Sequence, residues 1–210
     1  MSAVLKPPRF ANAEDYLAWE ELQPDRHEYV DGEVYAMVGT RAWHNIIAGN
    51  AYVWLWQWAR GGRCRVYMND HKLQVDASGD HFYPDLMVTC DARDNPGEED
   101  RFIRYPWLVV EVLSDSTAAF DRGRKFELYR TIETVTHYLL IEQSRPHADL
   151  FFKNAQDQWV LQPMSLGDLI PIDRLGQPWS ISTLYEGVDF AVAGRSVPPP
   201  VPDPGPNPGR

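Results

Sequence analysis

"YPDLMVTCD" (residues 83–91) is a short apolar stretch with an aspartate, Asp85, just ahead of its centre. A second stretch, "WLVVEVLS" (residues 107–114), carries a glutamate, Glu111, in its middle. Both have the length and the apolar content of buried strands. A buried carboxylate without a partner costs several kcal/mol or takes up a proton. Each of these strands must therefore provide its carboxylate with a partner.

Strand alternation places the two carboxylates. Residues two apart share a face, so Asp85 lies on the side of Met87, and Glu111 on the side of Val109 and Leu113. If the two strands are neighbours, the carboxylates repel each other unless a cation lies between them. Carboxylate oxygens without a nearby thiolate or histidine pair suit Mg²⁺ or Mn²⁺, and such an ion can activate water. The alternative is a salt bridge from Glu111 to an arginine across the sheet.

The segments around these strands alternate between helix and strand signals. Asp31-Gly32 between two β-rich runs predicts a two-residue hairpin, and apolar residues at helical spacing ahead of Gly61-Gly62 predict a long helix. This order predicts an α/β or α+β fold, with a mixed β-sheet flanked by helices. The expected elements are helix 11–22, hairpin 27–38, helix 41–62, strands 63–69 and 71–77, the two carboxylate strands, helix 120–132, strand 136–143 and hairpin 147–164.

Length and composition fit one folded domain. The chain has 210 residues, of which 44% are hydrophobic, enough to build a sizeable core. From Gly194 onward the sequence is rich in proline and lacks apolar periodicity. We therefore expect a single domain over residues 1–193 and a disordered tail over residues 194–210.

The chain shows no signal for a membrane or for secretion. Its apolar runs are shorter than the roughly 20 residues of a membrane span, and the N-terminal "MSAVLKPPRF" lacks the apolar region of a secretory signal. Cys64 and Cys90 are too few for a disulfide framework or a zinc site. We expect both to be small buried hydrophobic residues in a reduced compartment, and the protein to be cytoplasmic.

The net charge of −10 argues against a general polyanion binder. The basic residues are unevenly placed, however, with one group before the aspartate strand and a second group around and after the glutamate strand. Two interpretations stay open, a local basic groove or scattered solvated side chains. The two groups are Arg60, Arg63 and Arg65, and Arg101, Arg104, Arg122, Arg124, Lys125 and Arg130.

The spacing of the carboxylates resembles a nuclease pattern. Asp85 follows a proline, and Glu111 stands 26 residues later (111 − 85) in an apolar strand, which resembles the PD-(D/E)XK nuclease superfamily. Within it the chain resembles the large bacterial family of restriction-endonuclease-like proteins. The resemblance implies a restriction-endonuclease-like fold and a metal-dependent endonuclease that acts on nucleic acid, with DNA as the expected substrate. The matching pieces are "HEYVDGEVYAM", His44, "YPDLMV", "WLVVEVLS", "DRGRKFELY" and "HYLLIE".

The superfamily pattern places a lysine two residues after the glutamate, where this chain has Leu113. The resemblance implies that Lys125 on the following helix takes its place and positions water or stabilises the transition state. The alternative is local, because Asp121 and Lys125 are four residues apart and can form an ordinary helix ion pair.

Further site residues follow from the same resemblance. Asp85, Glu111 and the main-chain carbonyl of Val112 would bind the metal. An acidic residue of the hairpin, Glu28 or Glu33, would complete the site, and the sequence does not decide which one faces it. Both could instead be exposed hairpin charges. His44 could contact a phosphate or act as an auxiliary base, or it could be a capping or structural histidine.

The expected function is thus a Mg²⁺- or Mn²⁺-dependent endonuclease. Its rivals are a catalytically silent nucleic-acid- or partner-binding domain that keeps the fold, and a protein–protein module with a structural acidic pair. The family resemblance also implies a homodimer. Trp54, Trp56 and Trp58 could line its interface, although core packing is the commoner use of such a helix.

Overall fold

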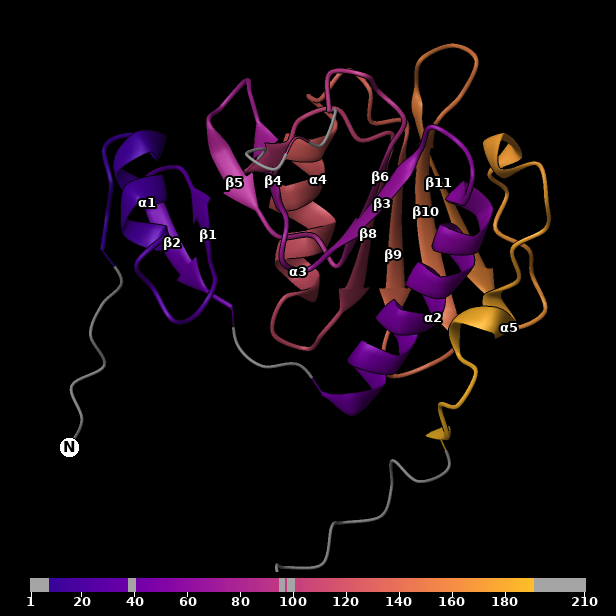
Figure 1. Ribbon diagram of the computed structural model, residues 1–210. Coiled ribbons are helices and arrows are strands. Elements are labelled where there is room, and N and C mark those ends of the chain that lie inside the picture. The colour runs from indigo at the N-terminus through magenta and orange to yellow at the C-terminus, as the bar shows by residue number, and fades with distance from the viewer. Residues whose placement is uncertain (1–7, 38–40, 95–96, 98–100, 191–210) are drawn as a thin grey trace, which may run out of the picture.

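The computed structural model describes residues 8–37, 41–94, 97 and 101–190. The predicted tail and the predicted domain boundary at residue 193 lie outside these residues. The described residues form a mixed α+β fold built on two β-sheets (Figure 1). Within them, no helix combines the length and the apolar character needed to cross a membrane.

A six-stranded sheet carries both predicted carboxylate strands. Its strand order is β11-β10-β9-β8-β6-β3, and β8 and β9 are parallel while the other neighbours are antiparallel. β6 pairs directly with β8, with Leu86 opposite Val110, so the condition under which the two carboxylates would be neighbours is met. The strands are β3 (Arg65–Met68), β6 (Leu86–Thr89), β8 (Leu108–Leu113), β9 (His137–Glu142), β10 (His147–Lys153) and β11 (Trp159–Ser165).

A second sheet contains the hairpin at Asp31-Gly32. Its order is β2-β1-β5-β4-β7, so the strands divide into two sheets where the sequence predicted one. Asp31 and Gly32 both have positive φ, 51° and 82°, as the predicted two-residue turn requires. The strands are β1 (His27–Val30), β2 (Glu33–Ala36), β4 (Lys72–Val75), β5 (Asp80–Phe82) and β7 (Phe102–Ile103).

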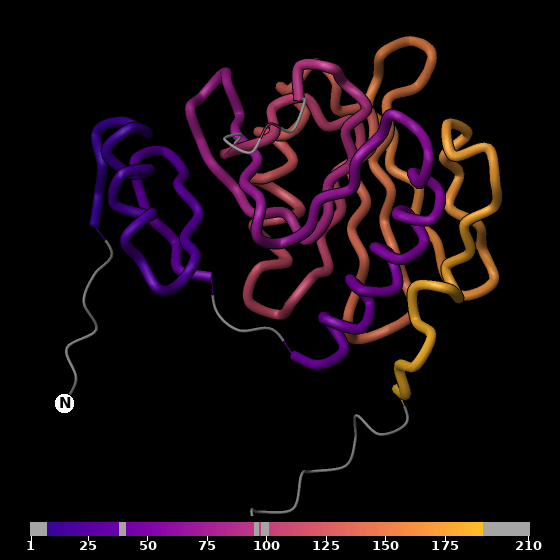
Figure 2. The backbone as a smooth tube through the Cα atoms, viewed as in Figure 1, coloured from indigo at the N-terminus to yellow at the C-terminus, as the bar shows by residue number. Residues whose placement is uncertain are grey.

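Helices cover both faces of the six-stranded sheet. α2 (Ala42–Ala59) and the C-terminal segment with η2 (Asp173–Leu175) and α5 (Ile181–Leu184) pack on one face. The run of α3 (Ala118–Phe120), η1 (Asp121–Lys125) and α4 (Phe126–Tyr129) lies between the other face and the second sheet (Figure 1). α1 (Ala13–Glu20) packs against the hairpin at the far side of the molecule from α5 (Figure 2).

Each face has its own apolar core, and strand alternation divides the residues between them. Leu86, Val110 and other even-numbered residues of β6 and β8 pack against α2. Met87 and Val109 pack instead with α4 and with residues of the second sheet. Glu111 shares its face with Val109, so it projects toward the helical run that carries Lys125.

The tryptophans of α2 divide between core and surface. Trp54 stacks on the buried Trp179 with ring centroids 4.7 Å apart, and Trp58 lies edge-on to Trp107 at 5.9 Å. Core packing is therefore their role within this chain. Trp56 is 45% exposed and lies under the guanidinium of Arg60.

The prediction for the cysteines is wrong. Cys64 and Cys90 form a disulfide that links residues 26 apart in sequence. Arg65 pairs with Thr89 at the end of the β3–β6 ladder, and the cysteines are the next residues beyond this pair. Two neighbouring strands thus bring them together, which sequence spacing does not reveal. The cytoplasmic prediction was partly based on two reduced cysteines. Because both are in a disulfide, that part of its basis is lost.

Candidate active site

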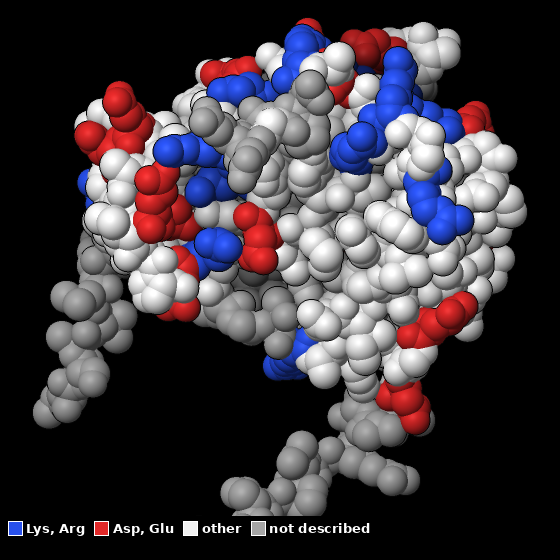
Figure 3. Space-filling model, in the orientation of Figure 1, with Lys and Arg blue, Asp and Glu red and all other residues white. Residues whose placement is uncertain are grey.

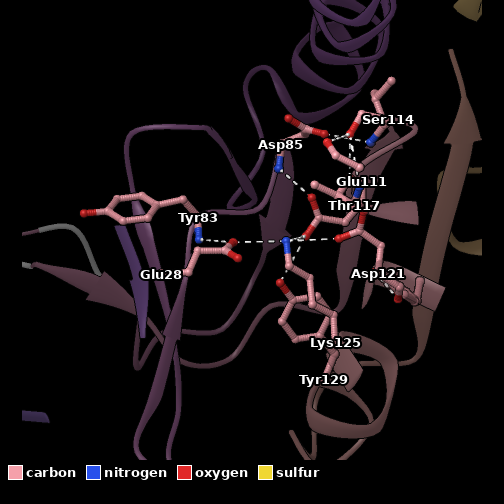
Figure 4. A network of polar contacts seen from close by, with 12 residues as sticks. Glu28, Tyr83, Asp85, Glu111, Ser114, Thr117, Asp121, Lys125 and Tyr129 are labelled. Carbon is pink, nitrogen blue, oxygen red and sulfur yellow. Dashed lines mark hydrogen bonds and ion pairs between the residues drawn. The ribbon is translucent and has the colours of Figure 1, made fainter. Parts of the chain in front are cut away.

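Asp85 and Glu111 meet where β6 begins beside β8 (Figure 4). The amide of Asp85 donates to Glu111 Oε2 at 3.3 Å, and the amide of Val112 donates to Asp85 Oδ2 at 2.7 Å. Both side chains are buried, with residue exposures of 8% and 4%. The predicted pair of neighbouring carboxylates is therefore present, and backbone amides of the two strand segments fix it.

Lys125 reaches this pair from the helical run. Its Nζ lies 3.1 Å from Glu111 Oε1, 3.0 Å from Glu28 Oε1 and 3.2 Å from Asp121 Oδ1. The predicted i, i+4 pair with Asp121 exists, but it is buried and is one of three ion pairs. A solvated helix pair therefore does not describe Lys125, whose amine joins three elements of the fold.

A π-helical turn presents Asp121 and Lys125 to the sheet. Residues 118–129 are continuously helical, where the sequence predicted 120–132, and the five residues Asp121–Lys125 form a π turn. Asp121 and Lys125 are buried, whereas Arg122 pairs with Glu142 and Arg124 with the exposed Asp31. Such turns are rare and often occur at functional sites.

The hairpin contributes Glu28 and not Glu33. Glu28 is 8% exposed, and its carboxylate also accepts from the Tyr83 amide at 3.3 Å. Glu33 lies at the turn end of β2, where its carboxylate pairs with Arg9 and accepts from the Tyr35 hydroxyl. The structure does not bring Glu33 to the cluster.

His44, near the start of α2, contacts Asp85 on the opposite side from Lys125. Its Nε2 lies 3.2 Å from Asp85 Oδ2, and the residue is buried. Burial lowers the pKa of His44, but the hydrogen bond and charge of Asp85 and the backbone of Val112 outweigh it, so the pKa is raised. His44 Nε2 and Asp85 Oδ2 are thus placed for a hydrogen bond, which is charge-assisted whenever His44 is protonated.

Three residues of the cluster were not predicted as site residues. The Tyr129 hydroxyl donates to Glu111 Oε1 at 3.1 Å, although its place on the apolar stripe of the helix indicated only core packing. Asp121 was considered only as a helix ion-pair partner. The Asn69 amide, with its nitrogen turned toward Asp85, lies 3.2 Å from Oδ1. The signal in the sequence was the spacing of Asp121, Lys125 and Tyr129, four residues apart on one helix face.

The cluster holds more negative than positive charge. Four buried carboxylates, those of Glu28, Asp85, Glu111 and Asp121, face one lysine and one histidine. Burial raises the pKa of Glu111 well above its ordinary value, Lys125 opposes this rise, and the neighbouring carboxylates add to it. The pKa of Lys125 is raised as well, because these acids outweigh its burial. A divalent cation would relieve the repulsion among the carboxylates.

The donor atoms suit a hard cation. Asp85 and Glu111 offer carboxylate oxygens and Val112 a main-chain carbonyl, which are ligands that Mg²⁺ prefers. Among the described residues, no group of three or more His, Cys, Asp and Glu side chains is arranged to hold a metal. Water would therefore have to complete the shell, which is usual for Mg²⁺ because it keeps several waters.

The cluster opens into a cleft of about 600 Å³ lined by the hairpin, the start of α2, the end of β8 and the helical run. In the part of the chain that the structure describes, no basic groove lines this cleft. The arginines after the glutamate strand are mostly paired, Arg122 with Glu142 and Asp149, and Arg124 with Asp31. Figure 3 shows basic and acidic side chains intermixed on the left of one face of the molecule, while basic side chains gather at its upper right. The group around Arg60 lies at the other end of α2 from His44, roughly 24 Å along the helix.

Comparison with known proteins assigns the family. A family model described as "Uma2: Putative restriction endonuclease" matches residues 13–189. The chain belongs to the Uma2 family. This confirms the predicted resemblance to restriction-endonuclease-like proteins.

Relatives extend over most of the chain. A Synechocystis protein named "Uncharacterized protein slr1290" is 37% identical over 177 residues, which cover 84% of this chain and 92% of that protein. A second one, sll1609, is 31% identical over 158 residues, 75% of this chain and 89% of that protein. The crystal structure of a "putative nuclease belonging to DUF820" from Anabaena variabilis matches with a TM-score of 0.69 at 14% identity. The match covers 84% of this chain and 98% of that one. At this identity the match shows the fold alone, and the predicted fold class is confirmed.

The match to the Uma2 family includes every residue of the buried cluster. Glu28, His44, Asp85 and Glu111 stand on four separate segments between residues 13 and 129, all within the matched range. The Uma2 fold thus brings together residues that are far apart in the sequence.

Proposed function

We propose that this protein is a divalent-metal-dependent endonuclease that hydrolyses phosphodiester bonds of nucleic acid, with DNA as the expected substrate. One observation carries the proposal: Lys125 Nζ lies 3.1 Å from a glutamate that is hydrogen-bonded to the Asp85 backbone, in a buried cluster open to a cleft. Membership in a family of nuclease-like proteins supports it.

Each residue has a part in the proposed reaction. Asp85, Glu111 and the carbonyl of Val112 would hold Mg²⁺ or Mn²⁺. The bound ion supplies a Lewis acid that polarises the phosphoryl oxygen and lowers the pKa of water. Lys125 positions the attacking water and stabilises the charge that develops on the phosphate. Its amine stays protonated and oriented because Glu28 and Asp121 also bind it.

His44 acts on the other side of Asp85. By donating to Oδ2 it fixes the orientation of the carboxylate and leaves the second oxygen to face Asn69. In its neutral form the same imidazole could accept a proton, as an auxiliary base does.

A catalytically silent binding domain is the second candidate. Each Glu111 oxygen already accepts from a protein donor, Oε1 from Lys125 and Tyr129 and Oε2 from the Asp85 amide. A cluster satisfied in this way could be purely structural. The first candidate predicts cleavage that requires a metal and Glu111, and the second predicts no cleavage.

A cleavage assay separates them. The full chain is incubated with labelled single-stranded and duplex oligonucleotides in Mg²⁺, Mn²⁺ or chelator. We expect products only with a cation, and none from Glu111→Gln or Asp85→Asn. Asp115→Asn is the matched control, because this carboxylate lines the same cleft but its side chain is 79% exposed. Cleavage that survives Glu111→Gln, or its absence under every condition with a folded protein, would contradict the proposal.

The homodimer and the cytoplasmic location belong to the same proposal. α2 exposes Val53 at 52% and Trp56 at 45%, which offers an apolar strip to a second copy. Light scattering coupled to gel filtration measures the mass directly. A monomeric mass at micromolar protein concentration would contradict the proposed homodimer.

A further inference from the structure

Tyr35 projects toward the same cleft as the acidic cluster. It stands on β2 directly opposite Glu28 of β1, and directly opposed residues of an antiparallel pair lie on one face of the sheet. Glu28 in turn contacts Lys125. Tyr35 lines the cleft but is 44% exposed and belongs to none of the apolar cores of the described residues. Its ring therefore lies at the open rim of the site.

A second aromatic ring continues from Tyr35 toward the lysine. The centroids of Tyr35 and Phe120 are 5.9 Å apart with their planes tilted by 32°. Phe120 is half-buried, and its centroid lies 6.0 Å from Lys125 Nζ. Met37, two residues after Tyr35, also lines the cleft and is 38% exposed. Phe120, Tyr35 and Met37 thus place apolar side chains between Lys125 and the open rim of the cleft.

The cleft offers few groups for a nucleic-acid backbone. Among its described lining residues the only lysine or arginine besides Lys125 is Arg41, and Arg41 lies 3.8 Å from the carboxylate of Asp115. Lys125 is buried and already contacts three carboxylates. Proteins that bind duplex DNA through its backbone use many phosphate contacts, which make their affinity strongly salt-dependent. The described lining of the cleft offers no such row of basic side chains.

Aromatic rings beside a few charges are instead typical of binding to unpaired bases, which stack on exposed rings regardless of sequence. From the position of Tyr35 we infer that the cleft binds single-stranded or unpaired nucleotides, with a base stacked on Tyr35 and Phe120 beside the scissile phosphate. This inference rests on the proposed function, and it names the substrate class. Stacking on one such ring is worth a factor of roughly 5 to 150 in affinity.

Binding of a fluorescent oligonucleotide tests the preference for unpaired nucleotides independently of cleavage. Anisotropy is measured with a 15-nucleotide single strand and its duplex, in chelator and in Ca²⁺, and gels confirm that both stay intact. We expect the single strand to bind at least tenfold more tightly than the duplex. With one or two phosphate contacts, the slope of log affinity against log salt should lie near −1, since each contact contributes about −0.7 for a single strand.

Substitutions separate stacking from general apolar contact. Tyr35→Leu keeps the apolar area but loses the ring, so affinity for the single strand should fall about 5- to 150-fold. Tyr35→Phe should bind within twofold of the parent. Leu161→Ala is the control, an apolar residue of similar exposure (50%) on β11 outside the lining of the cleft, and should also stay within twofold. Circular dichroism melts show whether each variant is folded, and if Tyr35→Leu is not, Phe120→Leu takes its place.

The outcomes distinguish this inference from the proposed function. Equal affinity for duplex and single strand, or equal losses in Tyr35→Leu and Leu161→Ala, would overturn the inference. Metal-dependent duplex cleavage that is indifferent to Tyr35 would overturn it too, while the nuclease proposal would stand. Single-strand binding that requires the Tyr35 ring, with no cleavage in any cation, would uphold the binding site and reject the nuclease.

Discussion

Leu113 occupies the strand position at which the superfamily pattern has a lysine. Its side chain is 1% exposed and packs in the core that Val109 and Leu128 also build. An amine placed there would lie in an apolar environment, and burying an unpaired charge is costly. Lys125 brings the amine to Glu111 from the helix instead. The amine that the strand lacks at position 113 is therefore placed beside Glu111 by Lys125, 3.1 Å from its Oε1.

Replacing Lys125 should destabilise the protein as well as inactivate it. Lys125→Met leaves three carboxylates buried without their common cation, and removing one partner of a buried ion pair costs about 3–5 kcal/mol. Urea unfolding at pH 7 measures this loss. It should shrink toward pH 4, because Glu111, whose pKa burial raises, then takes up a proton in the folded state.

Lys153→Met is the matched control. Lys153 Nζ lies 3.2 Å from an aspartate whose side chain is 82% exposed, and a pair with such a partner is worth about 0–1 kcal/mol. If both substitutions cost the same, Lys125 does not hold the cluster together.

At the scale of elements, the π turn at residues 121–125 should tolerate a side chain at Gly123. A Cβ built there meets no atom within 4 Å, and the backbone is not in the positive-φ region. Gly123→Ala should therefore raise the free energy of unfolding by about 0.4–1 kcal/mol. Gly32→Ala should do the reverse, because φ is +82° and the new Cβ would lie 3.1 Å from the Phe10 carbonyl oxygen. Denaturant unfolding of both variants shows whether the free energy of unfolding rises or falls. A destabilising Gly123→Ala would mean that the π turn itself requires glycine.

The disulfide should stabilise the edge of the six-stranded sheet. β3 is the edge strand, and the bond ties its start to the end of β6. Closing a loop of 26 residues restricts the unfolded chain by about 3.5 kcal/mol in the chain-entropy account, and measured values are typically about 2–4 kcal/mol. Reduction, or Cys64→Ser with Cys90→Ser, should lower the free energy of unfolding by this amount. Alkylation of the native protein prepared without reductant should find no free thiol. Two free thiols would contradict the bond.

Across the whole molecule, local patterns predicted the hairpins and the longer helices and strands but missed the short elements β5, β7, η2 and α5, and contacts between distant segments were harder to derive. The alternation of Val109, Glu111 and Leu113 gave the correct face because it depends only on strand geometry. The cysteine pair depends on which strands are neighbours. Selection of Glu28 over Glu33 depends on where the hairpin docks against the helical run. Neither relation leaves a periodic signal in the chain.

Charge within the cluster should make stability depend on pH. The pKa of Glu111 is raised above its ordinary 4.5, first by burial and then, against the opposing effect of Lys125, by the neighbouring carboxylates. A carboxyl whose pKa is higher in the folded state favours folding while it is protonated. The metal-free protein should therefore lose stability as the pH rises from about 4.5 through the raised pKa, and Glu111→Gln should remove that loss. Melting curves from pH 4 to 8 in chelator measure how the stability of the parent protein and of Glu111→Gln changes with pH.

A divalent cation should restore the stability that this repulsion removes. Binding only to the folded state adds RT ln(1 + [L]/Kd), about 1.4 kcal/mol at ten times the dissociation constant. For a chain of this length the thermal midpoint should then rise by about 3–6 °C in Mg²⁺ or Mn²⁺. Asp85→Asn and Glu111→Gln should abolish the rise, and Asp115→Asn, on the exposed lining of the cleft, should keep it. In chelator at pH 7, Glu111→Gln should be neutral or stabilising, because it removes one of several repelling charges. A structural salt bridge predicts the opposite, a midpoint indifferent to cations and a loss of about 3–5 kcal/mol in Glu111→Gln. Together these two results would contradict the proposed metal site and leave only the fold assignment standing.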